Sequence, residues 1–356
     1  MSDRPTRTVA VPVLRDLMRR LLAAGGCKPD VAATVAEVFL EANLRGMPTQ
    51  GLHHLTNVMM KHLLNGRTKP DGKPRIVKEG DAYALIDGEH GPGQIQALFA
   101  ADVGVEKARK AGSATIGLIN GSDLFMIGYY GERMARAGCI GLAFSDSPPL
   151  VHPTGGAERI FGTNPLFVAI PTADEHPFIL DMATSAWSAG HVRHAWYHGE
   201  KVPPGVGVGR DGRPTRDAGA IWQEGAMSAF GGHKGYGVSF IIGVLSSLLV
   251  GATTGKALRG WLPDDPTKAA IKGHLFLAID PAAFGDANAF RRAASAYIRE
   301  IRQSRKEPGA SAILIAGERS FAERERCLAR GSVPMFELIW QQTAKLAAEI
   351  GVAMPA

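Results

Sequence analysis

The pattern that most constrains the fold is an alternation of helical and short apolar segments that begins at residue 93. Residues 93–111 have helical periodicity and precede the apolar run "ATIGLI", and residues 124–137 precede "CIGLAF" in the same way. Further strand-like runs follow, namely "LFVAIP", "FILDMA", "HLFLAID" and "SAILIAG", with helices predicted near 286–304 and 335–350. This alternation predicts a mixed α/β fold, in which helices cover a central mixed sheet.

Two helices are expected before this region. The first covers residues 11–24 and places one set of apolar side chains on a single face: Val13, Leu14, Leu17, Leu21 and Leu22. The second follows Asp30, whose carboxylate can cap it. Pro, Gly and Asp residues then interrupt the chain between residues 64 and 92 around the strand-like run "AYALID", which we interpret as the entry to a second domain.

Composition excludes several classes of protein. A chain of 356 residues with 45% hydrophobic and 21% charged residues can bury a large core. The net charge of +6 comes from scattered Lys and Arg, so the sequence favours anionic small ligands and predicts no nucleic-acid partner. Cys27, Cys139 and Cys327 are far apart and lack metal-ligand spacing, which predicts no metal site and fits a reducing cytoplasm.

Neither the start of the chain nor its longest apolar run predicts a membrane segment. The N-terminal "MSDRPTRTVAV" lacks the apolar core of a signal peptide. The run "YGVSFIIGVLSSLLVGA" is interrupted by Gly and Ser, so we interpret it as a buried helix covering residues 234–251. The sequence therefore predicts a cytoplasmic protein without a membrane partner.

Glycine-rich stretches offer candidate phosphate sites, although no G-x-G-x-x-G follows a strand near the N-terminus. "GATTGKA" lacks the spacing of a Walker A motif and is rejected. In "FGGHKGYGVSF", Lys234 stands where a long helix begins, so its charge adds to that of the exposed N–H groups. The alternative is a glycine-rich loop with one solvated lysine.

Several stretches, taken together and in chain order, resemble the malate/L-lactate dehydrogenase family, which binds nicotinamide cofactors on a non-Rossmann fold. They are "LRGMPTQG", "IDGEHGPGQ", "PTGGAERIFGTNPLFVAIP", "LDMATSAWSAG", "PPGVGVGRDGRPTRDA", "GGHKGYG" and "ILIAGER". The family includes 2-hydroxyacid, ureidoglycolate, sulfolactate and diketogulonate oxidoreductases and reductases of cyclic imino acids. The resemblance implies an NAD(P)-dependent dehydrogenase or reductase with a small-molecule substrate, and it leaves the choice between NAD and NADP open.

The resemblance also implies which residues contact the cofactor. Lys234 matches a phosphate-contacting lysine, and Gly317 and Glu318 match a late loop that closes on the nucleotide. The other implied contacts lie on turns and on one strand end: Ser147, Thr163, Asn164, Asp181, Met182, Ala183 and Thr184. Hydroxyls and backbone groups at such positions can bond ribose or amide, and a lysine can neutralise pyrophosphate.

Three candidate catalytic positions depart from the family pattern. Gln50 stands where the family has histidine, His54 where it has arginine, and Asp123 where it has a second histidine. Gln50 has no proton to donate, and His54 is no bidentate clamp for a carboxylate. An ionised Asp123 would favour a cationic substrate such as an iminium, whereas a raised pKa would make it an acid. Asp123 as the cap of the helix that starts near Leu124, and His53 as a surface residue, are the structural alternatives.

These replacements leave two hypotheses. The first is an enzyme that transfers hydride between nicotinamide and a small carbonyl/hydroxy or imine/amine compound, through a divergent site containing Gln50, His54 and Asp123. The second is a catalytically inactive dinucleotide-binding relative that acts as a sensor or interaction protein. The resemblance further implies a homodimer.

The resemblance also implies a division of the chain into three parts. They are an N-terminal helical part of the substrate and dimer domain (1–75), a nicotinamide-binding domain (76–266) and a C-terminal segment that returns to the first domain (267–356).

Overall fold

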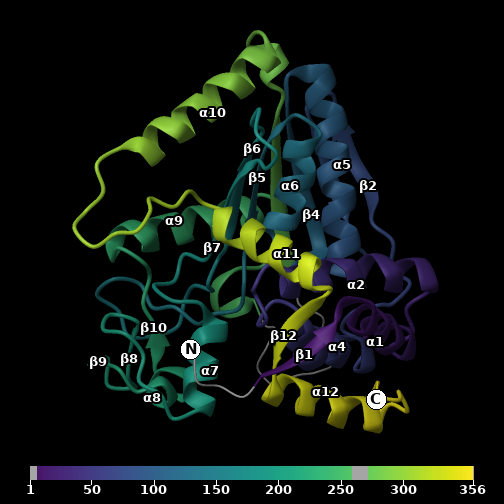
Figure 1. The fold of residues 1–356 in the computed structure, drawn as a ribbon, viewed down its shortest axis with the longest axis vertical. Coiled ribbons are helices and arrows are strands. Elements are labelled where there is room, and N and C mark those ends of the chain that lie inside the picture. The colour runs from purple at the N-terminus through teal and green to yellow at the C-terminus, as the bar shows by residue number, and fades with distance from the viewer. Residues whose placement is uncertain (1–5, 259–271, 356) are drawn as a thin grey trace.

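A computed structural model describes residues 6–258 and 272–355. Their helices and strands form a seven-stranded mixed sheet with helices on both faces, a helical layer at one end of the sheet and a smaller lobe beside that layer (Figure 1). The predicted α/β class is therefore confirmed.

The central sheet has the order β2-β3-β4-β11-β5-β6-β7. Its strands are β2 (Arg75–Gly80), β3 (Tyr83–Asp87), β4 (Ser113–Gly121), β5 (Ile140–Ser145), β6 (Leu166–Ile170), β7 (Phe178–Met182) and β11 (Lys272–Ile279). Only the β3–β4 pair is parallel among them. The strands predicted from "AYALID", "ATIGLI", "CIGLAF", "LFVAIP", "FILDMA" and "HLFLAID" are confirmed.

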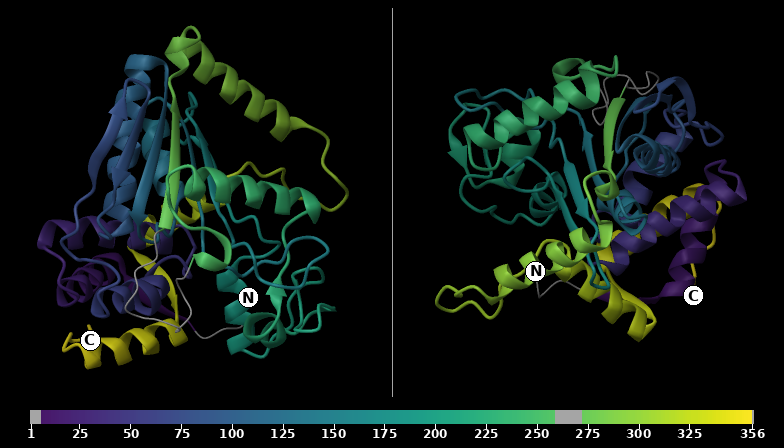
Figure 2. Two further views of the ribbon diagram at one scale, coloured as in Figure 1. Left: turned by 180° about the vertical axis from the view of Figure 1, so that it is seen from behind. Right: turned by 90° about the horizontal axis from the view of Figure 1, so that it is seen from above.

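Helices α5 (Gly93–Ala111) and α6 (Gly128–Arg136) pack on one face of the sheet, where they bury Ile116, Phe167 and Phe276. Helix α9 (His233–Gly243) and the π-helical turn Val244–Leu248 pack on the other face (Figure 2). Helix α10 (Ala287–Gln303) extends away from the body of the molecule, and only Ser295 of this helix is buried.

The helical layer combines the two ends of the described chain. It contains β1 (Thr6–Ala10), α1 (Val11–Ala24), α2 (Pro29–Leu44), α3 (Leu52–His54), the π-helical turn Leu55–Met59, α4 (Met60–Leu64), α11 (Glu318–Arg330), β12 (Ser332–Phe336) and α12 (Glu337–Glu349). Strands β1 and β12 pair antiparallel, and residues from both ends share one apolar core. This pairing fixes the C-terminal elements against the first helices.

Most of the smaller lobe comes from residues that follow β7, and Val151 of the β5–β6 connection also belongs to its core. The lobe comprises α7 (Ala189–Tyr197), β8 (Gly207–Val208), β9 (Pro214–Thr215), α8 (Ala218–Gln223) and β10 (Ala226–Met227), with short 3-10 turns at Gly255–Ala257 and Pro281–Ala283 elsewhere. The Pro- and Gly-rich stretch therefore contains short strands with their own apolar core around Val206 and Ile221. The sequence had indicated only a surface excursion there.

Several sequence predictions of local structure are wrong. The run "SAILIAG" forms no strand, because Leu314, Ile315 and Ala316 line a cavity instead of pairing along a sheet. Val13 is 38% exposed, and Lys28 rather than Asp30 stands at the N-cap of α2, which Pro29 begins.

The apolar run after Lys234 is a helix, as predicted, but it is only half buried. Phe240, Ile241, Leu248 and Leu249 are each more than half exposed, because only the opposite side of the run contacts the sheet. No helix of residues 6–258 and 272–355 is long and apolar enough to cross a membrane.

A buried ionic cluster joins the helical layer to the sheet. Arg45, at the end of α2, contacts Glu41 at 3.1 Å and forms a close ion pair with Glu132 of α6. Arg324 of α11 binds Glu41 at 2.9 Å, so three helices meet at this cluster. Removing Arg45 would leave Glu41 paired with Arg324 and Glu132 paired with Arg136, but both carboxylates would lose a hydrogen-bond donor that is itself buried.

We expect Arg45→Met to lower the free energy of unfolding by roughly 2 kcal/mol, measured by urea denaturation, because buried charge-assisted hydrogen bonds are lost. The matched control is Arg292→Met, which removes an exposed ion pair with Asp286 and should cost less than about 1 kcal/mol. Equal losses in the two variants would contradict the assignment of a structural role to the buried cluster.

Candidate functional site

A cavity of about 610 Å³ opens where the helical layer, the sheet and the smaller lobe meet. We call it the large cavity. Its walls come from the loops after α2 and β4, the ends of β5 and β7, helix α7 and the start of β11. Cavities of this size bind small molecules and cofactors.

Gln50 and His54 both line the large cavity. The turn that carries them is fixed by Asn43, whose side-chain oxygen accepts the backbone N–H of Leu52 at 2.8 Å. His54 is buried, with its ring 5.4 Å from that of Phe125. Burial, followed by the nearby His53 and Arg193, holds the pKa of His54 well below its usual value, so its imidazole is neutral.

His53 is buried next to the large cavity rather than on the surface, which corrects the alternative raised from the sequence. Arg193 of α7 donates to its Nε2 at 2.6 Å. Burial, with a further contribution from Arg193, lowers the pKa of His53 to about 3. His53 therefore joins α3 to α7, and His54 is the histidine of this pair that lines the cavity.

Asp123 lines the large cavity and caps no helix, because α6 begins at Gly128 with Ile127 at its N-cap. Its carboxylate forms a close ion pair with Lys272 and lies 3.9 Å from Nδ1 of His62. Burial by itself would raise the pKa of Asp123, but the Lys272 ammonium outweighs burial and lowers the pKa to about 2. The possibility that Asp123 is a protonated acid is thus wrong, and its counterion is a lysine of the chain.

A buried histidine supports the same wall. His274 lies two residues after Lys272, and its Nε2 is 3.1 Å from the carbonyl oxygen of Ser122, so Nε2 carries the proton. Its Nδ1 then accepts the hydroxyl of Ser145 at 2.9 Å. Burial, followed by Lys272, lowers the pKa of His274 to about 3 and keeps the ring neutral. Ser145 itself lines the cavity.

The sequence did not point to Lys272, Ser145 or His274. Lys272 precedes an apolar strand and matches no motif, so only strand pairing reveals that it lies beside Asp123. In the sheet, Lys272 is opposite Gly121, two residues before Asp123.

The predicted cofactor residues divide into three groups. One group lines the large cavity: Ser147, Thr163, Asp181, Met182 and Ala183. Asn164 and Thr184 are buried behind it and fix its walls. Lys234, Gly317 and Glu318 lie outside the large cavity.

The turn around Asn164 is tightly packed against Ser147. The Asn164 side-chain oxygen accepts the Ser147 N–H at 3.1 Å, and Thr184 donates to the carbonyl oxygen of Thr163 at 3.0 Å. A Cβ at Gly162 would lie 2.1 Å from the Ser147 carbonyl oxygen, so only glycine fits there. "GTNP" therefore positions the Ser147 and Thr163 hydroxyls through a close backbone approach.

Lys234, Gly317 and Glu318 have different surroundings. Lys234 is exposed in the first turn of α9. Gly317 caps α11 with a φ of 95°, a conformation that glycine adopts without strain. Glu318 forms a close ion pair with Arg302 and accepts the backbone N–H of Ile315 at 2.9 Å.

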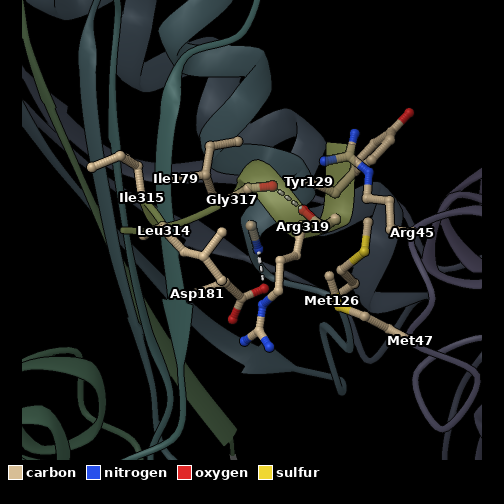
Figure 3. A pocket seen from close by; sticks show the side chains of 13 residues that line it. Arg45, Met47, Met126, Tyr129, Ile179, Asp181, Leu314, Ile315, Gly317 and Arg319 are labelled. Carbon is tan, nitrogen blue, oxygen red and sulfur yellow. Dashed lines mark hydrogen bonds between the residues drawn. The ribbon is translucent and has the colours of Figure 1, made fainter. Parts of the chain in front are cut away.

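A second cavity of about 450 Å³ adjoins the large one and shares Met47, Asp181 and Arg319 with it. We call it the side cavity. Figure 3 shows Arg319 beside Asp181, whereas Arg45 and Tyr129 lie close together at the right of the view. Gly317 also lines it, so the late loop and the end of β7 meet here. The two cavities are thus adjacent, and Arg319 is the cation that lines both of them.

Asp181 accepts the Gly128 N–H at 2.8 Å, yet it has no ion pair among the described residues. Burial raises its pKa to about 6, and the Gly128 N–H offsets this only in part. The carboxyl group therefore changes charge just below neutral pH, in the wall that the two cavities share.

Comparison with known proteins identifies the class to which this fold and site belong. Residues 9–343 match the family model described as malate/L-lactate dehydrogenase. The malate dehydrogenase of Pyrococcus abyssi is 34% identical over 340 residues, which cover 94% of this chain and 92% of that protein. A Δ1-pyrroline-2-carboxylate/Δ1-piperideine-2-carboxylate reductase of Pseudomonas syringae pv. tomato is 30% identical, with 93% and 94% covered.

The structures agree with this assignment. The malate dehydrogenase structure from Pyrococcus horikoshii OT3 superposes with a TM-score of 0.89 at 31% identity and covers 98% of this chain and 97% of that chain. The chain belongs to the malate/L-lactate dehydrogenase family, whose members are NAD(P)-dependent dehydrogenases and reductases.

The raised pKa of Asp181 predicts a pH-dependent difference between the wild type and Asp181→Asn. The Asp181 carboxyl holds its proton more tightly in the native state than in the unfolded chain. Protonated Asp181 therefore contributes its full share to the free energy of unfolding below about pH 4, and this contribution is lost as the pH rises through about 6. Asparagine keeps an acceptor for Gly128 without the charge. From pH 4 to pH 7, the stability of Asp181→Asn relative to wild type should increase by up to about 3 kcal/mol in urea titrations. A difference in stability between the two proteins that does not change with pH would contradict the raised pKa of Asp181.

Proposed function

We propose that this protein is an NAD(P)-dependent oxidoreductase that transfers hydride between nicotinamide and a small carbonyl/hydroxy or imine/amine compound. Gln50, His54 and Asp123 line its substrate side. The observation that supports this most strongly is that one cavity collects these three residues together with Ser147, Thr163 and the end of β7.

The cofactor side fits a nicotinamide dinucleotide in shape and chemistry. A dinucleotide has two parts joined by a pyrophosphate, and the large and side cavities are two spaces joined at Arg319. The guanidinium of Arg319 can bind phosphate oxygens, and the hydroxyls of Ser147 and Thr163 can bond ribose or amide groups. We assign the nicotinamide half to the wall formed by Asp181, Met182 and Ala183.

The proposed roles of the remaining predicted cofactor residues rest on other observations. Gly317 lines the side cavity, which supports a contact with the other half of the dinucleotide. Asn164 and Thr184 would act by fixing the turn behind Ser147 and Thr163. Lys234 and Glu318 are proposed from the family resemblance, with Lys234 at a helix start where an anion is favoured.

The chemistry of the proposed site follows from its protonation states. When bound, the nicotinamide would supply or accept a hydride at the substrate carbon. Gln50 can donate an N–H to a substrate oxygen, and the neutral His54 can bond a substrate without repelling a cation. Asp123 stays ionised and holds Lys272 at the cavity wall. Gln50 and His54 are compatible with either a carbonyl or an imine.

We expect calorimetry to detect saturable binding of NADH or NADPH by the wild-type protein, and a panel of 2-oxo acids and cyclic imines to include a substrate. His54→Ala should retain the cofactor affinity and weaken substrate binding by about tenfold, because it removes a wall contact only on the substrate side. Leu328→Ala, an exposed change on α11, is the control and should match the wild type.

Binding of neither nucleotide would contradict the proposed cofactor side. Binding without turnover of any compound on the panel would favour the catalytically inactive relative instead.

We further propose that the protein is a homodimer and that the half-exposed run after Lys234 contributes to its interface. Phe240, Ile241, Leu248 and Leu249 present exposed fractions of 56%, 54%, 57% and 63%. Adjacent apolar side chains at such exposure are typical of interaction surfaces.

We also propose the division of the chain into three parts, and the apolar core shared by both ends of the chain supports this division. The proposed boundary between residues 266 and 267 lies outside the described residues.

Light scattering after gel filtration should give twice the chain mass of 37.8 kDa for the wild type. Phe240→Glu with Leu248→Glu should shift the mass to that of one chain, because two charges would have to be buried in the interface. Tyr297→Glu on α10 is a matched control at an exposed apolar position and should stay dimeric. A wild type of single-chain mass would contradict this proposal.

A further inference from the structure

The wall of the large cavity that faces the helical layer carries a buried ion pair. Lys272 begins β11 and Asp123 follows β4, so the antiparallel pairing of these strands brings the two side chains together. Their side chains are only 9% and 13% exposed. Burying two charges costs several kcal/mol of desolvation, so packing alone gives no reason to keep such a pair.

Both residues line the cavity, so the pair is in contact with whatever the cavity holds. The charged and titratable groups around Lys272 are Asp123, His62, His54 and His274. All three histidines have lowered pKa values, chiefly because of burial, and so they are neutral near pH 7. Asp123 is ionised and is the one carboxylate of this group.

Few groups on the wall that carries Lys272 can release a proton; Asp181, His191 and His194 also line the cavity, but they lie on β7 and α7. Gln50 and neutral His54 are far too weak as acids, and Asp123 has already lost its proton. Arg319 stays protonated under all physiological conditions. An ammonium has three N–H bonds, and Asp123 Oδ1 accepts one of them, so the pair does not use up the donors of Lys272.

We propose that Lys272 is a catalytic residue that donates a proton to the carbonyl oxygen of the substrate, and that the substrate is therefore a 2-oxo compound rather than a cyclic iminium. This inference rests on the proposed function. During reduction the C=O π bond breaks, a hydride from the reduced nicotinamide forms the new C–H bond, and Lys272 Nζ gives the proton of the new O–H bond. The nicotinamide is oxidised, and the neutral amine regains its proton from water.

The direction of this proton transfer is favourable. The developing alkoxide is a far stronger base than an amine, so an ammonium can protonate it. Asp123 holds the ammonium at the wall and is itself paired with it, so its carboxylate is not available to bind a cationic substrate. A cationic iminium would meet the ammonium at close range, whereas a polarised carbonyl oxygen is attracted to it.

The test compares wild type, Lys272→Met, Lys272→Arg and the double variant Asp123→Asn/Lys272→Met. The double variant removes both charges and so avoids leaving Asp123 buried without a counterion. Lys110→Met is the matched control, since it removes an exposed lysine that pairs with Glu106. Melting temperatures establish which variants are folded.

The first readout is binding in the absence of turnover. Oxamate, a 2-oxo acid analogue that is not reduced, is titrated calorimetrically into each protein without cofactor, and NADH and NADPH are titrated separately. We expect Lys272→Met and the double variant to lose about tenfold in oxamate affinity and Lys272→Arg to retain most of it. All variants should keep the nucleotide affinity of wild type.

The second readout is reduction of pyruvate, oxaloacetate and Δ1-piperideine-2-carboxylate. Wild type and Lys110→Met should reduce an oxo acid with higher kcat/KM than the imine. Lys272→Met, Lys272→Arg and the double variant should lose at least about 100-fold in kcat, the usual contribution of general acid catalysis. Arginine keeps the charge but is a much weaker acid, so it separates binding from proton transfer.

The inference is overturned if folded Lys272→Met keeps more than about a third of the wild-type kcat, in which case His191 or His194 of α7 becomes the candidate donor. Faster reduction of the imine overturns the substrate class. Nucleotide binding without oxo-acid reduction also overturns the inference but leaves the proposed cofactor side intact. Failure to bind either nucleotide removes the proposed function and this inference with it.

Discussion

The structure depends on the insertion of β11 between β4 and β5. This strand comes from the last third of the chain and joins two parts of the sheet that would otherwise lack a common partner. Because its first residues lie at the cavity, the insertion also brings Lys272 beside Asp123 and His274 beside Ser145. The strand that completes the sheet is thus also the strand that supplies the buried charge of the site.

Burial sets the electrostatics of both cavities. It keeps His53, His54 and His274 neutral, and it raises the pKa of Asp181, which has no ion pair among the described residues. Asp123 behaves oppositely because Lys272 outweighs its desolvation. Two aspartates that line one cavity therefore differ in charge below about pH 6, and the difference follows from one neighbouring lysine.

The sequence predicts the elements better than the contacts between them. Periodicity located α5 and most strands of the sheet, and the family resemblance located Gln50, His54 and Asp123, all of which line the large cavity. The strand predicted for "SAILIAG" does not form, and Leu314, Ile315 and Ala316 line the side cavity instead. Lys272 could not be predicted, because its role depends on a strand register that joins positions about 150 residues apart.

The proposed function requires a nicotinamide dinucleotide to bind along the two adjoining cavities, with the substrate between it and Lys272. The most direct measurement is a crystal structure of the protein soaked with NADH, or NADPH, and oxamate. We expect the nicotinamide to lie against Asp181, Met182 and Ala183, with the oxamate oxygen facing the Lys272 ammonium. Density for the nucleotide outside both cavities, or for oxamate away from Lys272, would contradict it.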